Sequence, residues 1–233
     1  MMQLTHYRRN LIGDGCMETA NGGLSDFGRA VVKEMNRTGI MIDLSHAGWQ
    51  TAIDAAKCSS RPVIISHAAV WNLCRHVRCK PDEVIRAVVD SGGTIGITNA
   101  PALLGGSGDI SAFLDHIDYV ADRFGVDAVT IGTSSGFSYP DNETPSIFQN
   151  VSQHVNWENQ WQPEQKARFS ERGTAQQIQS MAWTNWPLFT VGLVQRGYSD
   201  VDIEKIIGGI FCGSLIRLGI SHGDTLIHNR FIM

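Results

Sequence analysis

The sequence predicts an α/β fold with parallel strands, formed by one large domain. From about residue 24 onward, short β-branched runs alternate with amphipathic helical segments, which is the pattern of successive strand–helix–strand units. The chain has 233 residues, of which 42% are hydrophobic, and this is enough to bury a sizeable core. We therefore expect a single soluble domain over residues 1–233.

Five segments have the character of strands. They are residues 3–6, 40–46, 62–67, 94–98 and 128–133. A closed TIM barrel needs eight parallel strands, so these five account for part of a barrel wall. The two outermost strands would then have open edges, which favour association with another chain. We expect the edges to be covered by a second copy of this chain, by a different chain, or by a polar segment folding back.

The first predicted helix follows residue 24 directly. Ser25 is its candidate N-cap and Gly39 lies just past its end, in the positions that these residue types favour. Phe27, Val31 and Met35 recur at helical spacing, and they should share the buried face of the helix.

Further helices are expected between the later strands. They cover about residues 48–57, 81–90 and 109–125. The second of these is stopped by two consecutive glycines, and the third has four apolar residues on one face: Phe113, Ile117, Val120 and Phe124. After the last strand, about residues 137–182 are polar and rich in Asn, Gln and Trp, so we expect a loop or lid. Helical patterns return at about residues 186–208.

Composition and charge exclude several classes of partner. The 19 Lys and Arg residues are balanced by 23 Asp and Glu residues, so nucleic acid and anionic membranes are not expected to bind. Five cysteines without a CxxC motif are typical of reduced thiols. The chain has no apolar stretch of signal-peptide or membrane-spanning length, and we expect a cytoplasmic location.

Two strands end in the same dipeptide, Ser-His. The runs IDLSH and IISH place His46 and His67 at the carboxyl ends of neighbouring strands, where parallel α/β folds build their sites. Strand alternation predicts that both imidazoles point inward, and that Ser45 and Ser66 face the other way and cap the following helices. Each histidine alone could be a hydrogen-bonded structural residue. Two together suit zinc or a similar divalent metal.

Several quoted segments together resemble the membrane dipeptidase family, peptidase family M19. They are GLSDFGRAVVKEMNRTGIMIDLSH, PVIISHAAV, RHVRCKPDE, LDHIDYVADRFGVDAVTIG and GLVQRGYSDVDIEKIIGG. The resemblance implies a (β/α)8 barrel of the metal-dependent amidohydrolase type, with two zinc ions, that hydrolyses dipeptides with a free C-terminal carboxylate. The five predicted strands would be the fourth to eighth of that barrel.

The resemblance also implies roles for particular residues. His46 and His67 match the two histidines that hold one metal ion. His6 matches the histidine that contacts the scissile carbonyl oxygen, and Arg78 matches the arginine that binds the substrate carboxylate. Ser134 stands where the family has an aspartate that helps to move protons. A serine is not expected to act as a carboxylate base.

The sequence departs from the family pattern in three ways. The family's N-terminal His-x-Asp strand and bridging glutamate precede the segment that matches here. The triplets HID at 116–118 and HGD at 222–224 do not replace it, because the first lies in a predicted helix and the second follows the last one. Ser134 replaces the aspartate, and Ile210 replaces the asparagine of a GGN motif.

The sequence thus supports a metal-dependent dipeptidase and leaves two alternatives open. One is a catalytically impaired relative that acts as a binding or scaffold protein. The other is a different metal-dependent amide or ester hydrolase, which would not need Arg78. With two imidazoles and no identified carboxylate, we expect one weakly held zinc ion.

Overall fold

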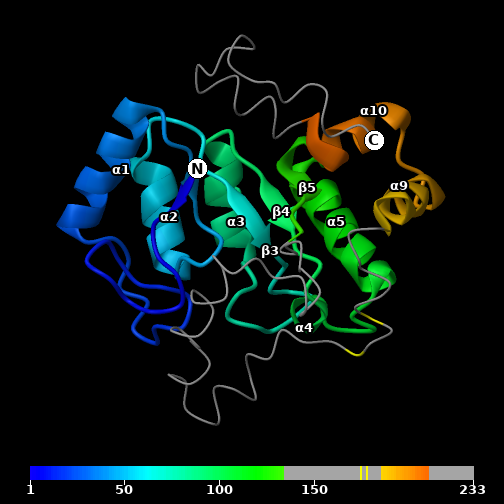
Figure 1. The fold of residues 1–233 in the computed structure, drawn as a ribbon, viewed down its shortest axis with the longest axis horizontal. Coiled ribbons are helices and arrows are strands. Elements are labelled where there is room, and N and C mark those ends of the chain that lie inside the picture. Colours follow the sequence, from blue (N-terminus) through cyan, green and yellow to red (C-terminus); the bar gives the residue numbers. More distant parts are fainter. Residues whose placement is uncertain (134–173, 175–176, 178–184, 210–233) are drawn as a thin grey trace, which may run out of the picture.

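The chain folds into a row of parallel strands flanked by helices. A computed structural model (Figure 1) describes residues 1–133, 174, 177 and 185–209. The strands are β1 (Met2–Gln3), β2 (Ile42–Asp43), β3 (Ile65–Ala68), β4 (Ile95–Ile97) and β5 (Val129–Ile131). β1 pairs with β2, and β3, β4 and β5 form a second sheet in that order. All of these pairings are parallel, and a parallel bridge between Asp43 and Ile64 connects β2 to β3.

All five predicted strands are present, in chain order, as neighbours in a barrel wall would be. They are shorter than predicted, and β1 has only two residues. The residues after β1 leave the ladder, and the carbonyl of Leu4 accepts a hydrogen bond from the side chain of Asn10 at 2.9 Å. Residues 4–6 therefore begin a loop.

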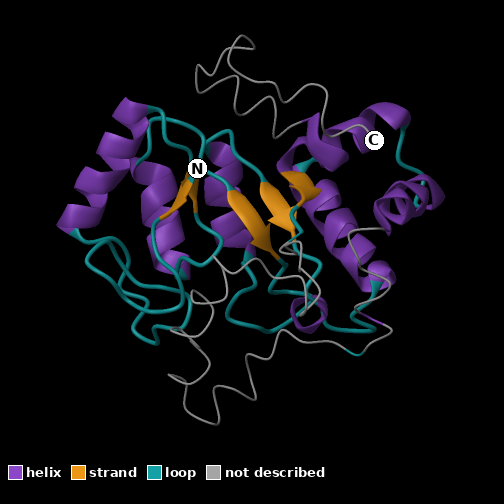
Figure 2. Cartoon of the chain, viewed as in Figure 1, coloured by secondary structure: helices purple, strands orange, loops and turns teal. Residues whose placement is uncertain are grey.

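The helices lie on both sides of the strands in the view of Figure 2. They are α1 (Asp26–Thr38), α2 (Trp49–Cys58), α3 (Asp82–Asp90), α4 (Pro101–Leu104), α5 (Ile110–Phe124), α9 (Trp186–Gln195) and α10 (Asp200–Glu204). A 3-10 turn, η1 (Val126–Ala128), precedes β5, and a π-helical turn, η4 (Lys205–Gly209), follows α10. The sequence did not predict α4 or the short turns, because so few residues show no periodicity.

The ends of α1 are as predicted. Ser25 accepts a hydrogen bond from the backbone N–H of Gly28 at 2.9 Å, and Gly39 has the left-handed φ of 72° that suits glycine.

The predicted buried face of α1 is wrong in part. Phe27 is 56% exposed, whereas Val32 and Met35 are buried. The helix is rotated because its Gly28 packs directly on the backbone, where an added Cβ would lie 2.1 Å from the carbonyl oxygen of Ile12.

Helix α5 packs its apolar face into the main core, as its periodicity predicts. Phe113, Ile117 and Val120 are fully buried there, while Phe124 is half-buried. The HID triplet has a structural role, because buried His116 hydrogen-bonds the backbone on both sides of its ring. That triplet is therefore not a substitute for a metal-binding strand.

A β-bulge shapes the end of β3. Ile65 pairs with Ile95 and Ala68 with Ile97, so three steps along β3 oppose two steps along β4. The extra residue falls at Ser66 and His67, where the strict alternation of side chains between the two faces of the strand breaks down.

Two glycines accommodate this bulge. A Cβ atom added to Gly96 would lie 2.2 Å from the carbonyl oxygen of Ser66, and one added to Gly132 would lie 1.9 Å from the same atom. Backbone packs so closely here that only glycine fits.

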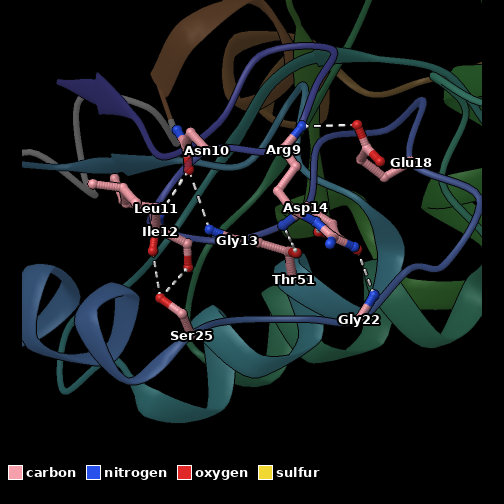
Figure 3. Close-up of polar contacts among 10 residues, drawn as sticks. All are labelled: Arg9, Asn10, Leu11, Ile12, Gly13, Asp14, Glu18, Gly22, Ser25 and Thr51. Carbon is pink, nitrogen blue, oxygen red and sulfur yellow. Dashed lines mark hydrogen bonds and ion pairs between the residues drawn. The ribbon is translucent and has the colours of Figure 1, made fainter.

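The loop between β1 and α1 is held by a buried carboxylate (Figure 3). Asp14 accepts hydrogen bonds from Arg9 Nε at 2.5 Å and from the backbone N–H of Gly22 at 2.6 Å. Its own N–H donates to the Thr51 hydroxyl in α2 at 3.1 Å. The bond from Arg9 lowers the pKa of Asp14, so the loop is anchored by a charged group at neutral pH.

Several predictions fall outside the described residues. The polar segment at 137–182 does so except for residues 174 and 177, as do Ser134, Ile210 and the triplet at 222–224. The helices expected at 186–208 correspond to α9, α10 and η4. The single-domain assignment and the association of copies stay predictions. In the part of the chain that the structure describes, no helix is long and apolar enough to cross a membrane.

Candidate metal and substrate site

The two strand-end histidines lie side by side. The Nε2 atoms of His46 and His67 are 3.0 Å apart, and the ring centroids are 5.0 Å apart. His46 is buried with 5% exposure, whereas His67 is half-buried. Sequence spacing alone places both residues at strand ends, and the pairing of β2 with β3 brings their ring nitrogens together.

The loop after β1 adds two aromatic rings to this pair. The imidazole of His6 stacks on that of His46 with centroids 4.2 Å apart, and the ring of Tyr7 meets His46 edge-on at 4.9 Å. His6 is exposed. The loop is held in place by backbone bonds, from Cys16 to His46 O at 2.9 Å and from Met17 to Tyr7 O at 3.0 Å.

Arg78 reaches the same cluster from the loop between β3 and α3. Its Nη2 donates to the carbonyl oxygen of His67 at 3.1 Å, and its guanidinium lies 5.9 Å from the centroid of the Tyr7 ring. The side chain is buried, with 2% exposure. The structure therefore brings together His6, His46, His67 and Arg78, while Ser134 lies outside the described residues.

A buried carboxylate beneath the histidines was not anticipated from the sequence. Asp43 accepts short hydrogen bonds from the hydroxyls of Ser45 and Ser66, both at 2.6 Å. It also accepts from both serine N–H groups at 3.0 Å and from Gln3 Nε2 at 3.1 Å. The expectation that the two serines cap helices is wrong, because both hydroxyls donate to Asp43, and α2 and α3 begin after Gly48 and Pro81 without a side-chain cap.

Burial and neighbouring charge set the ionisation of these groups. Burial lowers the pKa of His46, and the positive charges of Arg78 and His6 lower it further, so His46 is a neutral imidazole near pH 7. Burial alone would raise the pKa of Asp43, but the hydrogen bonds from the two serines outweigh it and hold the pKa below its ordinary value. Asp43 is therefore ionised.

A second buried charge near the cluster was also missed. Lys80 is fully buried and its Nζ donates to the carbonyl oxygen of Ala47 at 2.7 Å. Burial lowers the pKa of Lys80 to about 8. No sequence pattern marked this lysine as buried.

The histidine pair fits a divalent metal. The Nε2 atoms of the two imidazoles face each other at 3.0 Å, which is the spacing of two ligands about 2.0–2.1 Å from one ion. The Nδ1 atom of His46 is buried without a hydrogen-bond partner. Among the described residues, no group of three or more His, Cys, Asp or Glu side chains is arranged to hold a metal.

These features define the class of protein: a TIM-barrel-type α/β protein with a histidine cluster at the carboxyl ends of its parallel strands. The family model for membrane dipeptidase, peptidase family M19, matches residues 1–159. The chain belongs to this family, and the resemblance seen in the sequence is confirmed.

Known relatives agree on the fold. The chain is 30% identical over 210 residues to Dipeptidase tcpJ from Claviceps purpurea, covering 88% of this chain and 41% of that protein. An amidohydrolase structure from Pseudomonas aeruginosa matches with a TM-score of 0.69 at 30% identity, covering 93% of this chain and 63% of the other. A Rhodobacter sphaeroides metallopeptidase bound to a phosphinate mimic of L-Ala-D-Ala matches with a TM-score of 0.68 at 22% identity, covering 93% and 55%.

The partial-barrel fold class is thus confirmed. The chain spans less than two thirds of each of these relatives, and it contains five parallel strands in the described residues. The activity, substrate and metal content of a whole dipeptidase can therefore only be proposed for this chain.

Proposed function

We propose that this chain holds one metal ion and the reacting end of a dipeptide, as one part of a metal-dependent dipeptidase site. The observation that supports this most strongly is the 3.0 Å approach of His46 Nε2 to His67 Nε2, surrounded by His6 and Arg78. The family assignment and the dipeptidase name of a 30% identical relative support the same reaction class.

Each residue of the cluster has a role in the proposal. His46 and His67 hold the ion, which is zinc by family resemblance and which, when bound, supplies an activated water and polarises the scissile carbonyl. His6 is exposed beside His46 and stabilises the oxyanion by donating a hydrogen bond. Arg78 binds the substrate carboxylate with its planar fork of donors. Because Arg78 is buried, this role requires that substrate binding expose its guanidinium.

The ligand count favours one alternative, a binding or scaffold protein with impaired catalysis. Catalytic zinc sites normally use three protein ligands, and His46 and His67 supply two. The two functions differ in turnover but share metal binding, so the metal site is the first part to test.

We expect the 233-residue chain to bind a single zinc ion weakly, because two neutral imidazoles without a carboxylate give low affinity. His67→Ala should weaken zinc binding by more than about 100-fold, since losing a direct ligand costs more than losing an outer-shell partner. His6→Ala is the matched control, because it removes a neighbouring imidazole that is not an assigned ligand. Calorimetric zinc titration of the three proteins measures the effect.

Two observations would contradict the proposal. One is equal zinc affinity in the wild type and His67→Ala. The other is metal analysis after dialysis that finds two tightly held zinc ions per chain, which would require carboxylate ligands other than those assigned.

A further inference from the structure

We propose that Asp43 acts through Ser66 to fix the tautomer of His67, so that the ring is protonated at Nδ1 and its Nε2 lone pair faces His46. Asp43 and Ser66 would thus be positioning residues. The inference rests on the proposed function for the use of that lone pair in metal binding, but the tautomer itself is a property of the metal-free chain.

The first step is the direction of the bond between Ser66 and Asp43. Ser66 Oγ lies 2.6 Å from Asp43 Oδ2, the short distance of a hydroxyl donating to a carboxylate. An ionised carboxylate only accepts hydrogen bonds, and Asp43 already accepts from Ser45, from Gln3 and from two backbone N–H groups. The single hydroxyl proton of Ser66 therefore points at Asp43.

The second step is the bond between Ser66 and His67. Ser66 Oγ lies 2.8 Å from His67 Nδ1, and a hydroxyl has one proton to donate. Because that proton is committed to Asp43, the remaining role of Ser66 Oγ is to accept. The proton in the contact with His67 therefore belongs to Nδ1, and a neutral His67 has a bare Nε2.

The third step concerns the facing pair of ring nitrogens. The 3.0 Å contact between His46 Nε2 and His67 Nε2 needs one donor and one acceptor in the metal-free chain. With Nε2 of His67 bare, the donor is Nε2–H of His46. The two rings thus have opposite tautomers, and the proton between them would have to leave before both Nε2 atoms could bind one cation.

The backbone of β3 makes possible this relay, the chain of hydrogen bonds that runs from Asp43 through Ser66 to the ring of His67. Adjacent strand residues normally point to opposite faces, so Ser66 Oγ would not reach the ring of His67 in a regular strand. The bulge in β3, between the pairs Ile65–Ile95 and Ala68–Ile97, breaks this alternation. Metal-binding histidines are commonly oriented by a carboxylate on their other ring nitrogen, and here a serine stands between the two.

The test reads the tautomer directly. In the metal-free wild type labelled with ¹⁵N-histidine, NMR should show Nδ1–H for His67 and Nε2–H for His46. In Ser66→Ala, His67 should shift toward the Nε2–H form that free imidazole favours, and zinc affinity should fall by about tenfold. Ser66→Thr, which keeps the hydroxyl, should restore both.

The control is Ser45→Ala. Ser45 also donates to Asp43 at 2.6 Å, lies 3.0 Å from Ser66 Oγ and accepts from the backbone N–H of His67, but none of these hydrogen bonds is to the ring nitrogens of His67. Its loss should leave the tautomer unchanged, whereas Asp43→Asn should alter it. Far-ultraviolet circular dichroism of each variant checks that the chain is folded.

A wild-type His67 protonated at Nε2, or an unchanged Nδ1–H tautomer in folded Ser66→Ala, would overturn the relay. Failure of the proposed function looks different: the wild type would show the expected tautomers and yet bind no zinc. That outcome would support the relay and contradict the proposal that His46 and His67 bind a metal ion.

Discussion

Gly132→Ala should lower the free energy of unfolding by about 3 kcal/mol or more, the upper range for overpacking a core. The added Cβ would lie 1.9 Å from the carbonyl oxygen of Ser66 and 2.9 Å from the Cα of Gly96. Both are backbone atoms that no rotamer change can move, so β5 or the bulge in β3 must shift. Urea denaturation of the variant and the wild type measures the loss.

Gly106→Ala provides the control for this substitution. Gly106 has a φ of 52° and nothing within 4 Å of its added Cβ, so the cost is only that of a left-handed alanine, about 1–2 kcal/mol. A Gly132→Ala variant as stable as the wild type would show that the three strands do not pack as described.

The second large effect concerns catalysis. The 233-residue chain should hydrolyse dipeptides more than about 10⁴-fold more slowly than a complete family member, beyond the range of general acid–base help alone. Its assigned metal ligands are His46 and His67. These are two ligands, whereas a catalytic zinc site normally has three from the protein. Ser134→Asp should not restore the rate, because it adds a proton carrier and leaves the metal site unchanged. A dipeptide hydrolysis assay with added zinc measures both proteins.

This chain should still bind dipeptides although it hydrolyses them slowly. Arg78→Ala should weaken dipeptide binding. Arg78→Lys keeps the positive charge but not the planar fork of donors, so its dipeptide affinity should lie between those of the wild type and Arg78→Ala. Robust hydrolysis by the wild type would contradict the impaired site. Equal dipeptide binding in Arg78→Ala would remove its role as carboxylate anchor.

Sequence pattern predicted the order and type of the main elements, because the long helices bury one apolar face and the buried strands are short β-branched runs between them. The ends of α1 followed from Ser25 and Gly39, whose cap geometry is local. The exposed Phe27 was not foreseen, since the rotation of α1 depends on a distant contact between Gly28 and Ile12. Propensity along the chain contains no information about such a contact.

The candidate site could also be predicted only in part from the sequence. The repeated Ser-His at strand ends identified His46 and His67, and family resemblance identified His6 and Arg78. Alternation then misplaced Ser66, because a bulge is set by pairing with β4 and not by the residues of β3 alone. Asp43 was not singled out because it lies within an apolar strand, and only the pairing of β2 with β3 brings Ser66 to it.

The central claim, that His46 and His67 hold one metal ion between their Nε2 atoms, is tested most directly by X-ray absorption spectroscopy of the zinc-loaded chain. The account predicts two imidazole nitrogens at about 2.0–2.1 Å from the zinc in the wild type and the loss of this imidazole signal in the double variant His46→Ala/His67→Ala. A spectrum with the same imidazole contribution in the double variant would contradict it, because the ion would then be bound elsewhere.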